Sequence, residues 1–297
     1  MIRDAASKRL AGDDNPAAVK RGRSRVPHPL TWLNIVCLDA PLVAISWQWL
    51  FAQSFDVAVP SGAAAALFFT AWLIYLADRL GDSLSIDRRL ATSLRQRFCL
   101  EHRGAWIVAV VCVATVDALI AATLIGGPIM LWAAPVALLA IAYLFLNQRR
   151  PALWRVLPVK EITIGVLFAA GTIVAVVPEI APAATWPWLM FAALCSLNCI
   201  SIAAWERWLD QAQQRVSIAT VLPSAGSSVL PALVLLASAS GAAARSELPG
   251  QPIFACLTIS ASLLALVHLF RRRIQSDVRT ALADLVLLLP PLLGAIT

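Results

Sequence analysis

Two pairs of carboxylates have a spacing that could support chemistry. Asp78 and Asp82 form the first pair, and Glu206 and Asp210 form the second. A spacing of four residues puts both carboxylates of a pair on one helix face, with Cβ atoms roughly 5–6 Å apart. Mg²⁺ is usually held by one or two carboxylates, with water and substrate phosphate oxygens in the other positions. Two facing pairs therefore predict a catalytic metal site in which bridging Mg²⁺ holds a diphosphate and neutralises charge developing on that leaving group.

Basic residues expected at a similar depth in the membrane to these acids fit the same chemistry. Arg79, Arg149, Arg150 and Lys160 are candidates for gripping diphosphate oxygens, because Arg and Lys form strong charge-assisted hydrogen bonds with phosphate. A structural alternative stays open, in which the acids pair with neighbouring Arg residues. In that alternative, Lys160 extends its ammonium group to the membrane surface and has no substrate contact.

Four further polar residues lie within apolar segments and are candidates for lining a cavity. They are Asn34, Asp39, Asn198 and Asp284. Ionisable groups within a membrane span are costly and often mark functional sites. Hydrogen bonding between helices is an equally good interpretation of Asn198 and Asp39.

The composition indicates that lipid surrounds most of the chain. Of its 297 residues, 60% are hydrophobic and only 14% are charged, whereas soluble domains are about 45–50% apolar and about 25% charged. Apolar runs predict an all-α, polytopic membrane protein with about nine spans. The spans are expected near residues 30–53, 57–80, 104–125, 128–147, 159–177, 186–205, 216–240, 252–270 and 279–296. Residues 29–297 would then form a single transmembrane domain, and Pro223, Gly226 and Pro231 would interrupt the seventh span.

The distribution of Arg residues predicts the orientation. With the N-terminus in the cytoplasm, the inside loops carry thirteen Arg residues, and the outside loops carry only Arg245. The C-terminus would lie outside, and Arg-rich inside loops suit a bacterial inner membrane. Residues 1–28 are polar and basic without an apolar signal region, which predicts a disordered cytoplasmic tail. The net charge of +7 is explained by topology, so we expect no nucleic-acid partner.

Cysteine and histidine do not indicate a metal site. The six Cys residues lie in or beside apolar segments and include no Cys-x-x-Cys pair, and the three His residues are scattered. Buried, unreactive thiols are the interpretation that this pattern favours.

From about Leu30 to Thr297, the chain resembles the UbiA-type family of intramembrane prenyltransferases. The resemblance is carried by the nine expected spans, the inside N-terminus and the acidic motifs after the second and sixth spans. Asp78 and Asp82 match the last two acids of the family's Asn-Asp-x-x-Asp-x-x-x-Asp motif, whose first two positions are Ile74 and Tyr75 here. Glu206 and Asp210 match the Asp-x-x-x-Asp motif, and Asn198 is near a further polar position of the family. Residues 149–160 resemble the family's diphosphate-binding segment.

The resemblance implies a ring of helices around a central cavity and Mg²⁺-dependent chemistry. A polyprenyl group would move from its diphosphate to an aromatic or lipid acceptor within the membrane. Because Ile74 and Tyr75 replace two family ligands, a non-catalytic protein that binds isoprenoids or lipids is an alternative. A transporter is a third possibility, supported only by the interrupted seventh span and Asp39.

Overall fold

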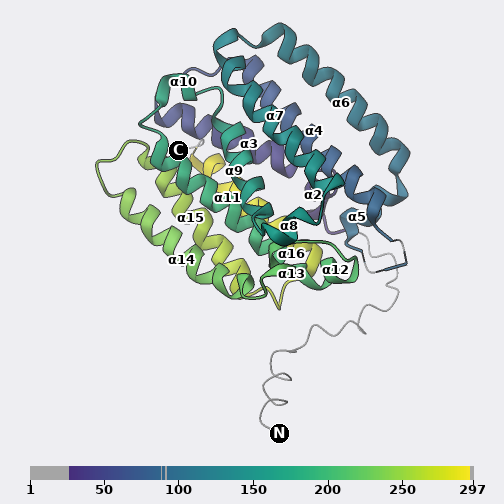
Figure 1. Cartoon of the computed structure of the whole chain (residues 1–297). Coiled ribbons are helices and arrows are strands. Elements are labelled where there is room, and N and C mark those ends of the chain that lie inside the picture. Colours follow the sequence, from purple (N-terminus) through teal and green to yellow (C-terminus); the bar gives the residue numbers. More distant parts are fainter. Residues whose placement is uncertain (1–26, 88, 91, 295–297) are drawn as a thin grey trace.

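The computed structural model describes residues 27–294, apart from residues 88 and 91, and the regular structure of this part is entirely helical. Much of the expected tail, residues 1–26, lies outside the described residues. Figure 1 shows the helices in chain order. They are α2 (Thr31–Ile35), α3 (Asp39–Ser54), α4 (Ser61–Ser85), α5 (Leu94–Glu101), α6 (Arg103–Leu124), α7 (Gly127–Arg149), α8 (Leu153–Val156), α9 (Lys160–Ile173), α10 (Val177–Ile180), α11 (Thr185–Trp205), α12 (Arg207–Ala212), α13 (Ile218–Val221), α14 (Ala225–Ala243), α15 (Gln251–Leu269) and α16 (Ser276–Gly294).

Six described helices are long and apolar enough to cross a membrane: α4, α6, α7, α11, α14 and α15. This supports the prediction of a helical integral membrane protein. The expected count of nine spans is not confirmed, because α3 has 16 residues and α9 has 14, whereas about 20 apolar residues span a bilayer. Helix α16 has 19 residues but carries Asp277, Arg279 and Asp284.

Two of the expected spans are broken into shorter helices. The first is interrupted at residues 36–38, where Cys37 adopts a left-handed φ of 58°. Asp39 is therefore the first residue of α3 and lies beside a helix break, whereas the sequence predicted one continuous span over residues 30–53. The seventh is interrupted at residues 222–224, so its long helix begins at Ala225. Both breaks place polar backbone and side chains at helix ends, where unpaired backbone groups need partners.

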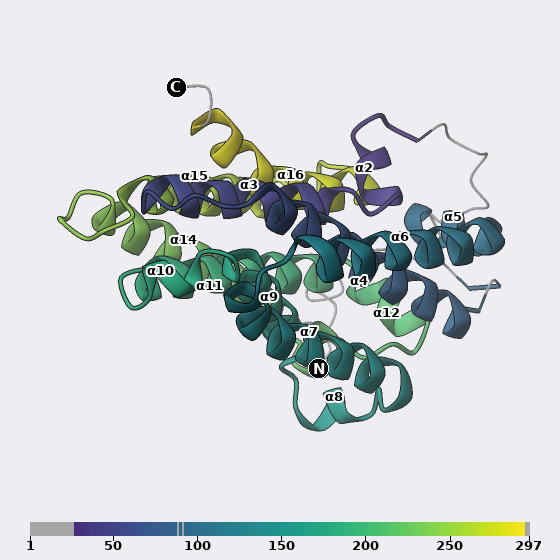
Figure 2. The ribbon, with the colours of Figure 1, turned by 90° about the horizontal axis from the view of Figure 1, so that it is seen from above.

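The main core lies between α3, α9, α11, α14, α15 and α16. Fully buried Trp47 and Phe191 stack with ring centroids 4.3 Å apart. The indole of Trp47 donates a 2.8 Å hydrogen bond to the carbonyl of Leu287, which ties α3 to α16. An aromatic pair of this kind contributes about 0.5–1.5 kcal/mol beyond its buried area. In Figure 2, α3, α15 and α16 lie together on one side, and α9, α10 and α11 lie on the other.

The expected ring around a central cavity is not confirmed by this arrangement. Helix α11 contacts α9, α14, α15 and α16, and α3 contacts both α4 and α9. The space between these helices contains buried side chains, including Phe51, Leu194, Phe254 and Leu257. The described pockets lie at the end of the long helices where α5, α8, α12 and α13 gather in Figure 1.

Close packing of α9 against α11 depends on Gly165. A Cβ atom added at this position would lie 2.4 Å from the backbone nitrogen of Ser196 and 2.6 Å from its Cα. Small residues allow helices to approach closely in membrane proteins. Since α9 begins at Lys160, this contact also fixes the helix that carries a predicted site residue.

Helices α6 and α7 present large apolar side chains on the outside of the molecule. Val108, Leu119, Leu131 and Leu138 are among the exposed residues, and Leu131 is 75% exposed. Contiguous exposed apolar surface indicates contact with a membrane or another protein. With the six apolar helices, this surface supports an integral membrane location.

Candidate functional site

The first predicted acidic pair lies on one continuous helix. Asp78 and Asp82 both belong to α4, as their spacing predicted. Asp78 accepts a 3.2 Å hydrogen bond from Nδ2 of Asn147 on α7. Asp82 forms an ion pair with Arg215, and the Asp82 side chain is only 14% exposed. The pair is therefore held by an amide on one carboxylate and a guanidinium on the other.

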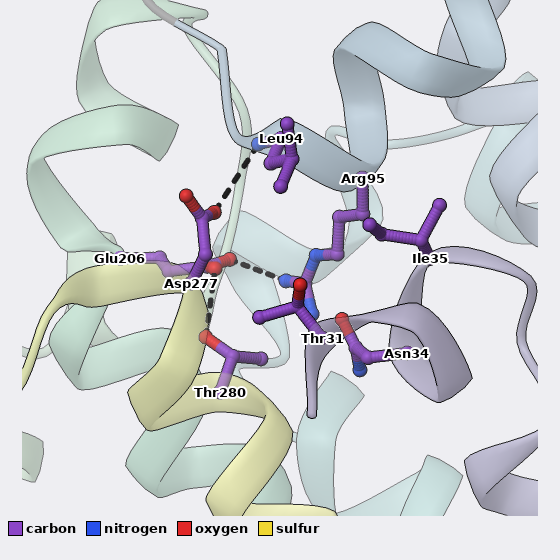
Figure 3. A pocket seen from close by; sticks show the side chains of 8 residues that line it. All are labelled: Thr31, Asn34, Ile35, Leu94, Arg95, Glu206, Asp277 and Thr280. Carbon is purple, nitrogen blue, oxygen red and sulfur yellow. Dashed lines mark hydrogen bonds and ion pairs between the residues drawn. The ribbon is translucent and has the colours of Figure 1, made fainter. Parts of the chain in front are cut away.

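The second predicted pair is divided by a helix break. Glu206 lies between α11 and α12, whereas Asp210 lies within α12. Glu206 forms a 2.6 Å ion pair with Arg95 of α5 and accepts a 3.3 Å hydrogen bond from Thr280 of α16. Figure 3 shows Arg95 and Thr280 reaching Glu206 from different helices.

Three basic residues interact electrostatically with the four predicted acids. Lys160 and Arg215 lie within electrostatic range of Asp78, Asp82 and Asp210. Arg79 lies within electrostatic range of Asp78, Asp82 and Glu206. Its Nε is buried and has no hydrogen-bond partner among the described residues. We use the name charged cluster for these seven residues: Arg79, Lys160, Arg215, Asp78, Asp82, Glu206 and Asp210.

Arg149 and Arg150 lie outside this cluster. They end α7 and are exposed. The Arg149 guanidinium lies 5.7 Å from the ring centroid of Phe145, one helical turn earlier. This contact is with an aromatic ring and not with the predicted acids.

The four candidate cavity residues form a network of their own. Nδ2 of Asn34 lies 2.6 Å from Oδ2 of Asp39 and 3.0 Å from Oδ2 of Asp284. Nδ2 of Asn198 donates a 3.0 Å hydrogen bond to Oδ1 of Asp284. Oδ1 of Asp39 accepts from the backbone nitrogen of Ala40 at 2.9 Å. We use the name amide-bound carboxyl pair for the two carboxyl groups together with the two uncharged amides, Asn34 and Asn198, that hold them.

A pocket of about 490 Å³ opens beside the charged cluster. Its lining includes Arg155 of α8, Arg215, and Thr220 of α13, together with Gln211 and Gln214. This volume is in the range of small-molecule sites, about 300–1,000 Å³. Two guanidinium groups and three neutral polar side chains give the pocket a chemistry suited to anions.

Asp210 is the cluster acid that lies outside the long helices. Burial raises the pKa of Asp210 to about 6, and the positive charge of Arg215 acts in the opposite direction. Because Arg215 also pairs with Asp82, protonation of Asp210 would leave Arg215 more available to an anionic ligand.

The predicted Mg²⁺ ligands do not form a complete site by themselves. Among the described residues, no group of three His, Cys, Asp or Glu side chains could hold a metal ion. Asp82 and Glu206 are also engaged by Arg215 and Arg95. Mg²⁺ is usually held by one or two carboxylates, with water and substrate phosphate oxygens in its other positions, so Asp78 and Asp210 remain candidate ligands.

Sequence reasoning missed the partners that neutralise the acids. Arg95 and Arg215 were counted only as loop charges, and Asn147 only as the end of a span. Their contacts with Glu206, Asp82 and Asp78 join positions 111, 133 and 69 residues apart, respectively. The spacing within one helix carries no signal for contacts at such separations.

Comparison with known proteins identifies no relative. No family model, curated protein or solved structure matches the chain.

Proposed function

We propose that the chain is a membrane-embedded prenyltransferase of the UbiA type that binds an isoprenoid diphosphate at the charged cluster. Its polyprenyl group would be transferred to an aromatic or lipid acceptor. The observation that carries the proposal is the convergence of Arg79, Lys160 and Arg215 on the acids of both sequence motifs. Acids and bases from α4, α9 and the α12 region would then act on one substrate head group.

The cluster has the donors that a diphosphate requires. The buried Nε of Arg79 lacks a hydrogen-bond partner among the described residues, and an unsatisfied buried donor costs about 1–3 kcal/mol. A phosphate oxygen would satisfy it. Arg215 also faces the 490 Å³ pocket, which offers a route for a polar head group toward the cluster.

In the proposed reaction, the bond between the first prenyl carbon and the diphosphate oxygen breaks, and the diphosphate leaves with the electron pair. A nucleophilic atom of the acceptor then forms a bond with the allylic cation and loses a proton. Arg79, Lys160 and Arg215 bind and orient the diphosphate and stabilise its growing charge. Bound Mg²⁺, held by Asp78 and Asp210, would supply further neutralisation of the leaving group.

The proposal also specifies which helices cross the membrane and on which side each terminus lies. We propose that α3, α9 and α16 cross the membrane beside the six apolar helices, which gives nine spans around the substrate. The N-terminus would lie in the cytoplasm and the C-terminus outside, in a bacterial inner membrane. The loop charges support this orientation, since inside loops favour Lys and Arg.

Thermal unfolding of the detergent-purified chain with geranylgeranyl diphosphate tests this proposal. A ligand that binds only the folded state raises its apparent stability by mass action. We expect stabilisation that requires Mg²⁺ and is lost in Asp78→Asn. No shift at saturating ligand, with the protein folded, would contradict the proposal.

A non-catalytic isoprenoid-binding or lipid-binding protein is the second candidate. It is favoured by the ion pairs Asp82–Arg215 and Glu206–Arg95, which already neutralise two predicted metal ligands. Under this alternative, geranylgeranyl diphosphate stabilises the chain equally with Mg²⁺ and with a chelator.

A further inference from the structure

The amide-bound carboxyl pair is separate in its contacts from the charged cluster. Its residues come from three parts of the chain: Asn34 and Asp39 at the break between α2 and α3, Asn198 on α11, and Asp284 on α16. Asn34, Asp39 and Asn198 are each more than nine-tenths buried, and Asp284 is partly buried between them. No step of the proposed transfer reaction uses this network.

The hydrogen bonds leave this site short of donors. One amide nitrogen, Nδ2 of Asn34, serves an oxygen of Asp39 and an oxygen of Asp284. This shared contact brings the two carboxyl groups together, because the same nitrogen lies 2.6 Å from one carboxyl oxygen and 3.0 Å from the other. Oδ1 of Asn198 is buried without a partner among the described residues, although its Nδ2 points at Asp284. The side chains of Asp39, Asp284 and Asn198 thus present several acceptor oxygens in a place where hydrogen-bond donors are few.

Most of the titratable groups that act on the pair are uncharged at neutral pH. Among the described residues they include Cys37, Tyr75, Arg95, Cys195 and Cys199. Of these, only Arg95 is charged at neutral pH, and it is ion-paired with Glu206.

The titratable groups on the other packed helices have contacts elsewhere. Lys160 of α9 acts on the charged cluster, Glu161 of α9 accepts from Ile218, and His268 of α15 accepts from Trp205. On α16 itself, Asp277 accepts from Leu94, and Arg279 donates to the carbonyls of Arg271 and Trp205.

We propose that Asp39 and Asp284 form a proton-binding site that holds one proton between them at neutral pH. Adjacent carboxylates cannot both be ionised in a low-dielectric site, so such pairs share a proton. The shared proton supplies the donor that the acceptor oxygens lack, while the remaining negative charge is held by the amides of Asn34 and Asn198. In membrane proteins, buried acids of this kind serve in proton relays.

A small polar pocket lies beside this site and has Asn34 in its lining. It has a volume of about 10 Å³, which is about the space of one water molecule. Figure 3 shows its lining, in which Asn34 lies on the same pocket as Arg95 and Glu206. Because Asn34 also contacts both carboxyl groups, the proton would exchange through this pocket, from the end where α2 and α5 lie.

Infrared spectroscopy of the full chain in lipid vesicles tests the proposal. The carboxyl stretching band of a protonated Asp should be present at pH 7, although an ordinary Asp has a pKa of about 3.9. We expect Asp284→Asn to remove this band and the surface variant Glu101→Gln to leave it unchanged. Glu101 is a suitable control because its side chain is 56% exposed.

Three results would overturn the proposal. They are a spectrum of the unmodified protein without the band, a band that persists unchanged in Asp284→Asn, and a band that disappears when NaCl replaces choline chloride. The last result would assign the site to Na⁺. If Asp284→Asn does not fold, Asp39→Asn provides the same test, because either variant removes one of the two carboxyl groups that share the proton.

Discussion

The charged cluster and the amide-bound carboxyl pair hold their acids in opposite ways. In the cluster, Asp82 and Glu206 contact guanidinium groups. In the carboxyl pair, Asp39 and Asp284 contact amides and a backbone nitrogen. A site rich in bases can bind an anion through its positive charges. A site in which acids have only neutral donors is stabilised by binding a cation, such as a proton. We infer that the same residue type binds anions with the help of bases in one site and a proton in the other, according to its neighbours.

Among the variants that test this difference, Arg215→Gln should destabilise the protein most. Arg215→Gln leaves Asp82 beside Asp78 without its ion-pair partner, and loss of one member of a largely buried pair costs about 3 kcal/mol. Chemical unfolding in detergent measures the loss. Adding Asp82→Asn to Arg215→Gln should recover most of it, and a double variant no more stable than Arg215→Gln alone would show that the pair is not the cause.

Asn34→Leu should produce the next largest loss, about 2 kcal/mol, because it removes the shared donor from two carboxyl groups. Asn147→Leu is the matched control, since Asn147 makes one hydrogen bond to Asp78, which also has Lys160 and Arg79 nearby. Unfolding midpoints compare the two variants. An equal or larger loss in Asn147→Leu would contradict the distinction between the two sites.

Asp210 should give the stability of the protein a pH dependence of about 2 kcal/mol between about pH 4 and pH 6. Its pKa of about 6 in the folded state exceeds the ordinary value of about 3.9. The folded state therefore binds more protons between these values, and the free energy of unfolding should decrease as pH rises from about 4 to about 6. Asp210→Asn should show a shallower decrease in that window. A slope identical to that of the unmodified protein would contradict the assignment.

The exposed ion pair between Arg97 and Glu101 should contribute least to the stability of the protein. Both side chains are more than half exposed, and exposed pairs at this spacing contribute about 0.3–0.5 kcal/mol. Arg97→Gln should therefore change the unfolding midpoint very little. A large loss would mean that overall charge, and not burial within a cluster, determines the effect of Arg215→Gln.

The sequence predicted the helices better than their ends and partners. Apolar length located the six long helices, because each must bury its backbone hydrogen bonds within itself in lipid. The acids Asp78 and Asp82 share a helix as their spacing required. The left-handed Cys37, the break at Glu206 and the shared contact of Asn34 with Asp39 and Asp284 were not predicted. These features depend on tertiary contacts between residues as much as 250 positions apart.

Equilibrium binding of labelled geranylgeranyl diphosphate, with Mg²⁺ present, measures whether the charged cluster binds a diphosphate. The charged cluster should be the anion site, so Arg79→Gln and Lys160→Gln should each weaken binding about tenfold or more, equivalent to about 1.4 kcal/mol. Arg97→Gln removes the same charge from an exposed position and should leave the dissociation constant unchanged. Equal affinity in all three variants and the unmodified protein would contradict the assignment of the charged cluster as a diphosphate site.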